Sequence, residues 1–326
     1  MVKKKTFLIA EIGINHHGNL SKALQLVNQA KNSGADAVKF QYFKPEDIYN
    51  KNSNDYKSLE KFYLDIKQIS KINKFCKKKK IIFICTPFSI TSFNMLKKLS
   101  PKFYKIASMD FNNEYLISEI LKKTKSKIIL STGMASKREL LNFKKKFNKN
   151  LNRFVILHCI SCYPTITNEV NFKTIDYLKK IFPKNLIGFS DHTIGNNMMK
   201  ISLNYKIDFI EKHFTDNKMK NGADHKLSAD ARDIRNFRLF ENDLNASHGN
   251  NLFNLKFRPD TKNRNKYRRG IYFSRNIKKN CSLKIDDFRF VRPVVKFSLQ
   301  DLKFFLNKKL KKNVKIGNLV DKSFFK

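Results

Sequence analysis

The chain contains 326 residues, of which 41% are hydrophobic, including 30 Phe. That apolar content is enough for a folded core and excludes an intrinsically disordered chain. Lys and Arg number 67 against 27 Asp and Glu, which gives a formal net charge of +40. Such a charge favours acidic partners, but the lysines are spread among many Asn, Ile and Phe residues, which is typical of a biased codon composition. We find no base-reading or RNA-stacking motif, so a basic nucleic-acid-binding protein is kept as the non-enzymatic alternative.

The N-terminus and the cysteines bear on the compartment. The opening "MVKKKTFLIAEIG" has a basic lead, but Glu11 interrupts its apolar run and no small-residue cleavage site follows, so we expect no signal peptide. No stretch is long and apolar enough to suggest a membrane span. Five scattered cysteines stand at Cys76, Cys85, Cys159, Cys162 and Cys281. The "CISC" spacing matches a redox or zinc pair without a second pair, and we interpret all the cysteines as structural thiols of a cytoplasmic protein.

Short apolar segments of strand character alternate with longer Lys-rich segments of helical period. The strand segments are "TFLIAEIG" from Thr6, "AVKFQ" from Ala37, "IIFICT" from Ile81, "KFYKIAS" from Lys102, "KIILST" from Lys127, "FVILHC" from Phe154, "LIGFS" from Leu186 and "IDFIEKH" from Ile207. This alternation is typical of a parallel sheet with crossover helices. Eight such units predict a (β/α)₈ TIM barrel, with an open sheet as the alternative.

The composition changes after the last barrel segment and predicts a second domain. We expect the barrel to occupy residues 1–245. The polar, Asn-rich stretch "NASHGNNLFNLKFRPDTKNRNKY" predicts a linker at 246–267. Residues 268–326 are strand-rich and too few for a second large domain, so they predict a small β-rich C-terminal domain.

Polar residues gather at the carboxyl end of every predicted strand. They are Glu11 with Asn15 and His16, Lys39 with Gln41, Thr86, Lys105 with Ser108, Ser131 with Thr132, His158 with Ser161 and Tyr163, Ser190 with Asp191 and His192, and Glu211 with His213. In a barrel these ends meet at one face, where active sites are built. The sequence therefore predicts a site at that face.

The residue types indicate what the site could do. His192 and His213 end neighbouring strands, and two neutral imidazoles are good ligands for a divalent metal that keeps open positions. Asp191 and Glu211 beside them could orient those ligands or act as bases. Asp224, in "GADH", follows the last strand and would lie near the metal.

An anion cradle is predicted at the same face. Lys39 and Lys105 lie within apolar strands, where a lysine is unexpected, and serine and threonine hydroxyls are interleaved with them. Glu11 supplies a carboxylate for a general base or a sugar hydroxyl. Together these groups favour metal-assisted carbon–carbon bond formation or isomerisation on a phosphorylated or acidic substrate.

At these residues the chain resembles the sialic acid synthase family, including the legionaminic and pseudaminic acid synthases. The matching stretches are "AEIGINHHGN", "DAVKFQ", "CTPF", "YKIAS", "STGM", "HCISCYP", "GFSDHTIG", "EKHFT" and "GADHKLSAD". "RRGIYFSRNIKKN" and "RFVRP" resemble the family's antifreeze-like (SAF) domain. The resemblance implies condensation of phosphoenolpyruvate with an N-acyl hexosamine, in a homodimer whose small domain caps the partner's barrel.

The resemblance also implies roles for individual residues. His192 and His213 would hold a divalent metal, Mn²⁺ first, with Mg²⁺ or Co²⁺ as alternatives. Phosphoenolpyruvate would be bound by Lys39, Thr86, Lys105, Ser108, Ser131 and Ser190. The sugar would be bound by Gln41, Asp110, Tyr163, Asp224 and Arg292, with Arg292 reaching in from the partner. Glu11 would contact the sugar or handle protons. We predict Glu11, Glu211 and Asp191 as the catalytic residues, the last two because they lie beside the histidines in sequence.

Three departures from the family pattern affect the acceptor sugar. Asp110 stands where many relatives have a glutamate, Ser161 replaces a common asparagine, and "RPVV" lacks the glycine usual after "RP". The motifs do not separate N-acetylmannosamine from the 2,4-diacetamido-trideoxyhexoses as acceptor. Another phosphoenolpyruvate-dependent 3-deoxy sugar acid synthase is the enzymatic alternative.

Overall fold

The computed structural model of the chain describes residues 5–248 and 258–325. The chain divides into two compact units after His248. In the first unit, eight parallel strands pair in sequence order and close into a barrel. The predicted (β/α)₈ fold is confirmed, and the open-sheet alternative is wrong because β1 also pairs with β8.

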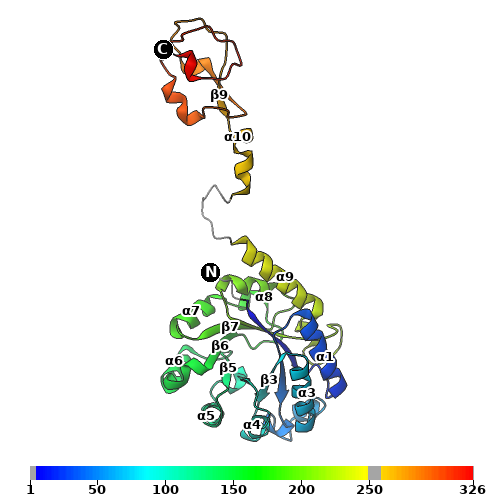
Figure 1. Cartoon of the computed structure of the whole chain (residues 1–326). Coiled ribbons are helices and arrows are strands. Elements are labelled where there is room, and N and C mark those ends of the chain that lie inside the picture. The colour runs from blue at the N-terminus through cyan, green and yellow to red at the C-terminus, as the bar shows by residue number, and fades with distance from the viewer. Residues whose placement is uncertain (1–4, 249–257, 326) are drawn as a thin grey trace. The chain divides into compact units, whose positions relative to one another are not determined.

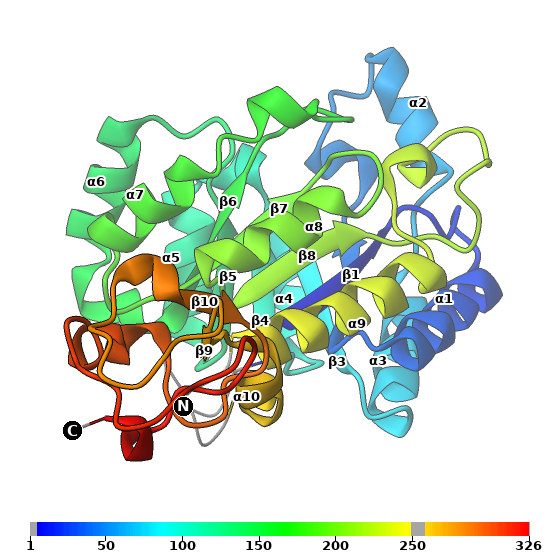
Figure 2. The ribbon, with the colours of Figure 1, turned by 90° about the horizontal axis from the view of Figure 1, so that it is seen from above.

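The strands of the barrel agree with the predicted segments. They are β1 (Phe7–Gly13), β2 (Ala37–Tyr42), β3 (Ile82–Pro87), β4 (Phe103–Ile106), β5 (Lys127–Ser131), β6 (Phe154–Cys159), β7 (Leu186–Asp191) and β8 (Phe209–His213). The helices of this unit are α1 (Leu20–Ser33), α2 (Asn54–Glu60), α3 (Ile66–Lys78), α4 (Ile90–Lys97), α5 (Glu114–Lys123), α6 (Lys137–Lys146), α7 (Lys173–Ile181), α8 (Asn197–Ser202) and α9 (Ala231–Ser247). The helices lie outside the ring of strands (Figure 1), and β1, β8 and β7 run side by side beneath α8 and α9 (Figure 2). No helix of the described ranges is long and apolar enough to cross a membrane.

Helix α1 illustrates how local sequence produces these elements. The side chain of Asn19 caps its first turn by accepting a hydrogen bond from the Lys22 N–H. Its apolar residues recur at helical spacing and are buried against the barrel. Gly34 ends the helix at φ 106°, a left-handed conformation that glycine adopts without steric cost.

The strands alternate between two environments because successive side chains point to opposite faces. Outward-facing side chains pack under the helices in the main core. Inward-facing side chains at the amino-terminal halves of the strands form an apolar plug. We define this plug as Ile9, Ala37, Ile84, Phe103, Ile129, Val155, Leu157 and Phe209.

The amino-terminal end of the barrel is fastened by a cluster centred on Arg238 of α9. Its guanidinium contacts the carboxylates of Asp36 and Glu241 and donates to the carbonyl of Thr6. Glu241 in turn accepts from the Thr6 N–H at 2.7 Å. This cluster joins the last helix to the first two strands and lies far along the strands from the predicted site.

The second unit is small and has its own core. Strands β9 (Gly270–Phe273) and β10 (Phe288–Val291) pair antiparallel, and helix α10 (Arg264–Tyr267) precedes them. Apolar side chains from both strands, from the segment between them and from the segments after β10 make up the core. Of the predicted linker, residues 249–257 lie outside the described residues, and the predicted barrel boundary at 245 falls before the end of α9.

Candidate active site at the carboxyl face of the barrel

The carboxyl ends of the strands enclose a cavity in which most predicted site residues meet. It is lined by Glu11, Lys39, Gln41, Thr86, Phe88, Lys105, Ala107, Ser108, Ser131, Cys159, Tyr163, Ser190, His192, Glu211 and His213. It measures about 50 Å³, which leaves room for a few water molecules. Larger ligands would therefore have to separate side chains that now contact one another.

Strand alternation and register explain why charged side chains share this interior. Glu11 lies two residues after Ile9 of the plug, so both side chains point inward. The register places Glu11 beside Lys39 on β2 and beside His213 on β8. Each strand therefore changes from an apolar to a polar inner face within one or two steps of the alternation.

Two carboxylates and two ammonium groups form an ion network inside the barrel. The Lys39 Nζ lies 2.6 Å from Glu11 Oε2 and 3.8 Å from Glu211 Oε2. The Lys105 Nζ lies 3.8 Å from Glu211 Oε1, which also accepts a hydrogen bond from Ser190 Oγ at 3.0 Å. Since all four charged residues are at most 5% exposed, each depends on the others for charge compensation.

The network drives the two carboxyl pKa values apart. Burial raises the pKa of Glu11, although the ammonium group of Lys39 opposes the shift. Burial also disfavours ionisation of Glu211, but Lys105 and Lys39 outweigh it and lower the pKa of Glu211. One carboxyl group is thus suited to exchanging a proton and the other to remaining ionised, an arrangement typical of acid–base sites.

Hydroxyl groups with free hydrogen-bonding capacity lie next to the lysines. Thr86 Oγ1 and Ser131 Oγ are buried and have no hydrogen-bond partner among the described residues. Buried polar groups are normally satisfied, so their lack of partners indicates that a ligand completes the site.

Gly133 closes one side of this cradle. Its N–H donates to Ser108 Oγ at 3.1 Å. A Cβ atom at Gly133 would lie 2.5 Å from Ser108 Oγ and 2.3 Å from Ser161 Oγ. Only a glycine therefore allows both serine hydroxyls to approach this backbone. Ser161 therefore borders the cradle directly.

The two histidines face each other across the cavity with ring centroids 5.4 Å apart. His192 Nδ1 lies 2.8 Å from the carbonyl oxygen of Ile160, and because a carbonyl only accepts, Nδ1 carries a proton. Burial disfavours the charged form of His192, but the Cys159 thiol and the Ile160 carbonyl outweigh burial and raise its pKa. Burial, with help from His192 and Lys39, lowers the pKa of His213 well below its ordinary value. His213 is therefore neutral, which is the form that binds metals.

These features fit a divalent metal held by two imidazoles with open positions. Within residues 5–248 and 258–325, no group of three or more His, Cys, Asp and Glu residues could hold a metal. His213 Nδ1 is a buried atom without a hydrogen-bond partner there, at 3.3 Å from Asp224 Oδ2. A metal at this place would thus complete its coordination with oxygen atoms of water or substrate.

Aromatic and loop contacts complete the mouth of the site. The Tyr163 ring lies 4.2 Å from the His192 ring and 6.0 Å from the His213 ring. Asp224 comes from the loop after β8, and its N–H donates to Asn15 Oδ1 at 3.1 Å. Because Asn15 also donates to the Phe214 carbonyl, it holds this loop against the end of β1.

Four residues that were predicted to act in the site do not line the cavity: Asp224, on the loop after β8, and Asp191, Asp110 and Arg292. Asp191, predicted as catalytic, faces outward from β7 and pairs with Lys212 at 2.9 Å. Asp110 lies in a 3₁₀ turn after β4, where it accepts a hydrogen bond from Asn113. Arg292 belongs to the second unit, where its guanidinium lies 5.4 Å from the Tyr267 ring centroid.

Cys159 lines the cavity but was not among the predicted site residues. Its Sγ accepts a hydrogen bond from Ser108 Oγ at 3.4 Å and lies 3.9 Å from His192 Nδ1. The signal was available, because Cys159 is two residues after Leu157 and shares its inward direction. Cys159 therefore touches both the hydroxyl cradle and one of the histidines.

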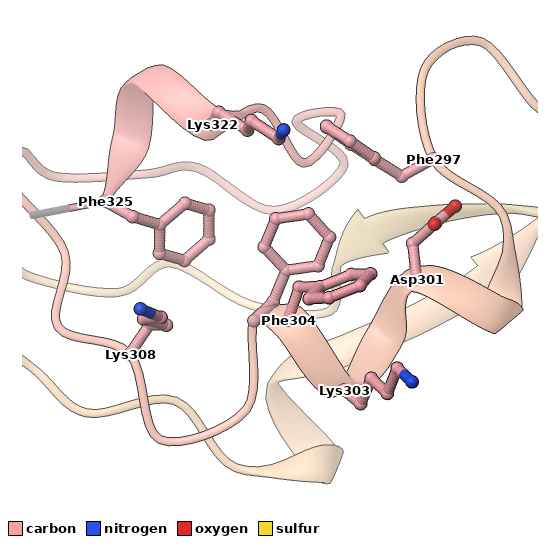
Figure 3. A pocket seen from close by; sticks show the side chains of 8 residues that line it. Phe297, Asp301, Lys303, Phe304, Lys308, Lys322 and Phe325 are labelled. Atoms are coloured by element: carbon pink, nitrogen blue, oxygen red, sulfur yellow. The ribbon is translucent and has the colours of Figure 1, made fainter.

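A larger hollow lies in the second unit, but it carries no comparable chemistry. It measures about 490 Å³, and its described lining residues include no histidine, cysteine or hydroxyl group. It is lined by Phe297, Asp301, Lys303, Phe304, Phe305, Lys308, Lys322 and Phe325 (Figure 3). Asp301 is the one carboxylate among these described lining residues, and no histidine or hydroxyl accompanies it, so the barrel cavity is the candidate active site.

Fold and site together define a (β/α)₈-barrel protein with an anion cradle beside two histidines. The NeuB family model matches residues 26–251, which is more than half of the chain. The chain belongs to the NeuB family, and the resemblance recognised from its motifs is confirmed.

Named relatives align over nearly the whole chain. An N,N'-diacetyllegionaminic acid synthase from Campylobacter jejuni is 33% identical over 334 residues, which cover 97% of this chain and 99% of that protein. A pseudaminic acid synthase from the same species is 30% identical and covers 99% of this chain and 97% of its own length. The crystal structure of an N-acetylneuraminic acid synthetase from Leptospira borgpetersenii, with citrate, has a TM-score of 0.73 at 29% identity. That match covers 77% of this chain and 88% of the other.

Proposed function

We propose that this protein is a nonulosonic acid synthase, which joins phosphoenolpyruvate to an N-acyl hexosamine and releases phosphate. The observation that carries the proposal is that two buried lysines, two hydroxyls without a partner among the described residues and two histidines line one cavity. An anion cradle beside an open metal site suits a phosphorylated carboxylic acid that must react with an aldehyde. The names of the relatives support the same class of product.

The lysines and hydroxyls would bind phosphoenolpyruvate. Lys39 and Lys105 now neutralise Glu11 and Glu211, so entry of the substrate would turn their ammonium groups toward its phosphate and carboxylate. Thr86 and Ser131 would donate hydrogen bonds to it, since their hydroxyls have no partner among the described residues. The substrate is thereby oriented with its C3 carbon toward the histidines, and positioning supplies much of the acceleration.

The chemistry would proceed by attack of C3 on the aldehyde, addition of water at C2 and loss of phosphate through cleavage of the C–O bond. Glu11 would exchange the proton, since burial raises its pKa toward neutrality. Glu211 would stay ionised and keep Lys105 in place.

His192 and His213 would hold the divalent metal, for which Mn²⁺ is our first choice and Mg²⁺ and Co²⁺ are alternatives. When bound, the metal would supply polarisation of the aldehyde oxygen. Tyr163 and Asp224, which both lie beside His213, would contact the sugar. Gln41, which donates to Glu11 Oε1 at 3.3 Å, would contact the sugar from the opposite side.

The test is phosphate release from phosphoenolpyruvate with and without Mn²⁺. The acceptors would be N-acetylmannosamine and the 2,4-diacetamido-trideoxyhexoses of manno and altro configuration, with a hexose or pentose phosphate as control. We expect metal-dependent release with one unphosphorylated N-acyl sugar. Silence across the panel from folded, metal-loaded protein would contradict the proposal.

The same assay addresses the alternatives. Release with the sugar phosphate alone would favour a 3-deoxy sugar acid phosphate synthase, whose likeness here rests on folds 12% identical in sequence. A nucleic-acid-binding protein would instead retain DNA or RNA on a filter at physiological salt, with affinity falling steeply as salt rises. A cytoplasmic location, which we also propose, agrees with the cysteines, all of which are free.

A homodimer completes the proposal. Exposed apolar side chains follow several strands at the mouth, among them Met109, Met134, Ile194 and Met219. Such a rim suits coverage by a protein surface, and we propose the small domain of a partner subunit with its Arg292.

Mixing two weakened variants tests this arrangement. His213→Ala disables a barrel but keeps Arg292, whereas Arg292→Ala keeps the barrel. If the arginine acts on the partner, unfolding and refolding the two together should restore activity in the mixed dimer. No recovery, in a mixture shown to contain mixed dimers, would contradict the swapped arrangement.

A further inference from the structure

Directly behind the two histidines lies a buried ion pair that faces away from the cavity. Asp191 and Lys212 are 0% and 1% exposed, and the Lys212 Nζ lies 2.9 Å from Asp191 Oδ2. Neither residue lines the candidate active site. Their charges therefore serve no direct contact with a substrate in that cavity.

The pair is joined to the backbone around His192. The Thr193 N–H donates to Asp191 Oδ1 at 2.8 Å, and the Lys212 Nζ donates to the Thr193 carbonyl oxygen as well as to Asp191. Asp191 and Thr193 flank His192 in sequence, so the backbone on both sides of His192 is held by these hydrogen bonds. Lys212 immediately precedes His213 and is the partner of Asp191 in the register between β7 and β8.

Further backbone contacts make the two histidines part of one frame. The His192 carbonyl accepts from the Thr165 N–H at 3.0 Å, and the His213 carbonyl accepts from the Ala229 N–H at 2.7 Å. With these bonds in place, the side-chain link between Lys212 and residues 191–193 fixes the ends of β7 and β8 relative to each other.

Stability alone does not account for this pair. Desolvation of two buried charges offsets much of their attraction, and well-packed apolar side chains at such positions are often equally or more stabilising. An ion pair differs from apolar packing in holding its two partners at a defined distance and direction. What it fixes here is the spacing of the two residues that follow it, His192 and His213.

We propose that Asp191 and Lys212, with the Thr193 backbone, form a clamp that sets the geometry of His192 and His213 for a divalent cation. Asp191 and Lys212 are positioning residues, since neither touches the cavity. The inference rests on the proposed function in taking the two histidines as metal ligands. It assigns Asp191 a role different from the catalytic one predicted from the sequence.

The experiment measures Mn²⁺ binding to the full-length protein, by electron paramagnetic resonance of free Mn²⁺, for the wild type and two variants. Lys212→Met keeps the length of the side chain and removes the charge. We expect its Mn²⁺ affinity to fall by about 10- to 100-fold, the range typical of residues that orient metal ligands. Asp191→Asn keeps the shape and the acceptor for Thr193, so a smaller loss in the same direction is expected. If Lys212→Met fails to fold, the Mn²⁺ affinity of Asp191→Asn tests the proposal in its place.

Arg238→Met is the matched control, because it removes a largely buried cation at the opposite end of the strands, from its pairs with Asp36 and Glu241. We expect it to lower the melting temperature while leaving Mn²⁺ affinity unchanged. Phosphoenolpyruvate affinity without metal should be unchanged in the clamp variants.

Each outcome decides something. Wild-type Mn²⁺ affinity in folded Lys212→Met and Asp191→Asn protein would overturn the clamp alone, and so would an equal loss in Arg238→Met. Absence of Mn²⁺ binding by the wild type would overturn the metal assignment of the proposed function, and the clamp with it.

Discussion

The two halves of each barrel strand place opposite kinds of side chain in the same interior. At the amino-terminal halves the interior holds the apolar plug, from Ile9 of β1 to Phe209 of β8. Two to four residues further along, it holds an ion network, unpartnered hydroxyls and histidines. The backbone geometry is shared, so side-chain chemistry alone separates the two regions.

The comparison shows how stability and function are divided along one set of strands. In the plug, close-packed apolar side chains stabilise the fold and have no reactive groups. In the carboxyl half, the buried Thr86 Oγ1 and Ser131 Oγ have no hydrogen-bond partner among the described residues, which leaves them available to a ligand. Substitutions in the two halves should therefore change different measurable quantities.

The largest expected effect comes from His213→Ala in the carboxyl half. Loss of one of two imidazole ligands should reduce metal-dependent turnover by about 1,000-fold or more, since a catalytic metal contributes several kcal/mol. The measurement is Mn²⁺-dependent phosphate release, with circular dichroism to verify the fold. Turnover equal to the wild type would mean that His213 holds no metal.

Phe209→Ala tests the plug. Phe209 lies on β8, two residues before Glu211. Removing a buried ring that contacts Phe7 and Phe103 should lower the free energy of unfolding by about 3–5 kcal/mol. Urea denaturation measures the loss, and Leu239→Ala on the exposed face of α9 is the control. Mn²⁺ affinity of the folded variant should stay at the wild-type value, and a parallel loss would show that the halves are not independent.

A pH effect is expected from His16, which lies at the boundary of the two regions after β1. Burial lowers its pKa to about 4 from 6.5, and its Nδ1 accepts from the Gly18 N–H. Because folding lowers the pKa of His16, the unfolded chain binds a proton there more readily than the folded protein does. The folded state is therefore at its full stability above pH 6.5, and it loses stability as the pH falls from 6.5 toward 4. His16 alone would account for about 3 kcal/mol of that loss.

Urea denaturation across this pH range, for the wild type and His16→Gln, measures the contribution. The variant should show a smaller fall in unfolding free energy than the wild type. Identical slopes for both proteins would mean that His16 is not held neutral by the fold.

The smallest expected effect is at Gly133, in the anion cradle. An alanine Cβ would lie within 2.5 Å of the hydroxyl oxygens of Ser108 and Ser161 and displace them. Phosphoenolpyruvate affinity in calorimetry should fall about 10-fold, which corresponds to about 1.4 kcal/mol. Adding Ser161→Ala removes the nearer contact and should restore part of the affinity. An unaffected single variant would place the substrate elsewhere in the cavity.

Much of the fold and part of the site could be predicted from the sequence because both follow local patterns. Alternation of strand and helix segments gave the barrel, and polar residues at strand ends gave the face. Lys39, Lys105 and Glu11 stood out because charged residues are rare within apolar strands. Each of these features can be recognised from a residue and its neighbours in the sequence, without knowledge of the three-dimensional structure.

The remaining assignments depend on direction and distance. Asp191 was predicted beside the metal ligands, yet Ser190 points inward and alternation turns the next side chain outward, toward Lys212. Cys159 is the register partner of Ser190 on the neighbouring strand, and its side chain also points inward. The place of Asp224 depends on Asn15, which is more than 200 residues away in sequence, a contact that no local pattern contains.

The central claim is that the carboxyl half of the barrel forms a carbon–carbon bond at C3 of phosphoenolpyruvate while phosphate leaves from C2. The most direct measurement uses phosphoenolpyruvate labelled with ¹⁸O in the C–O–P bridge, together with the active acceptor sugar and Mn²⁺. Mass spectrometry of the released phosphate should find the label, because the C–O bond breaks, and His213→Ala should release almost none. Unlabelled phosphate would mean that the P–O bond breaks instead, and this result would contradict the account.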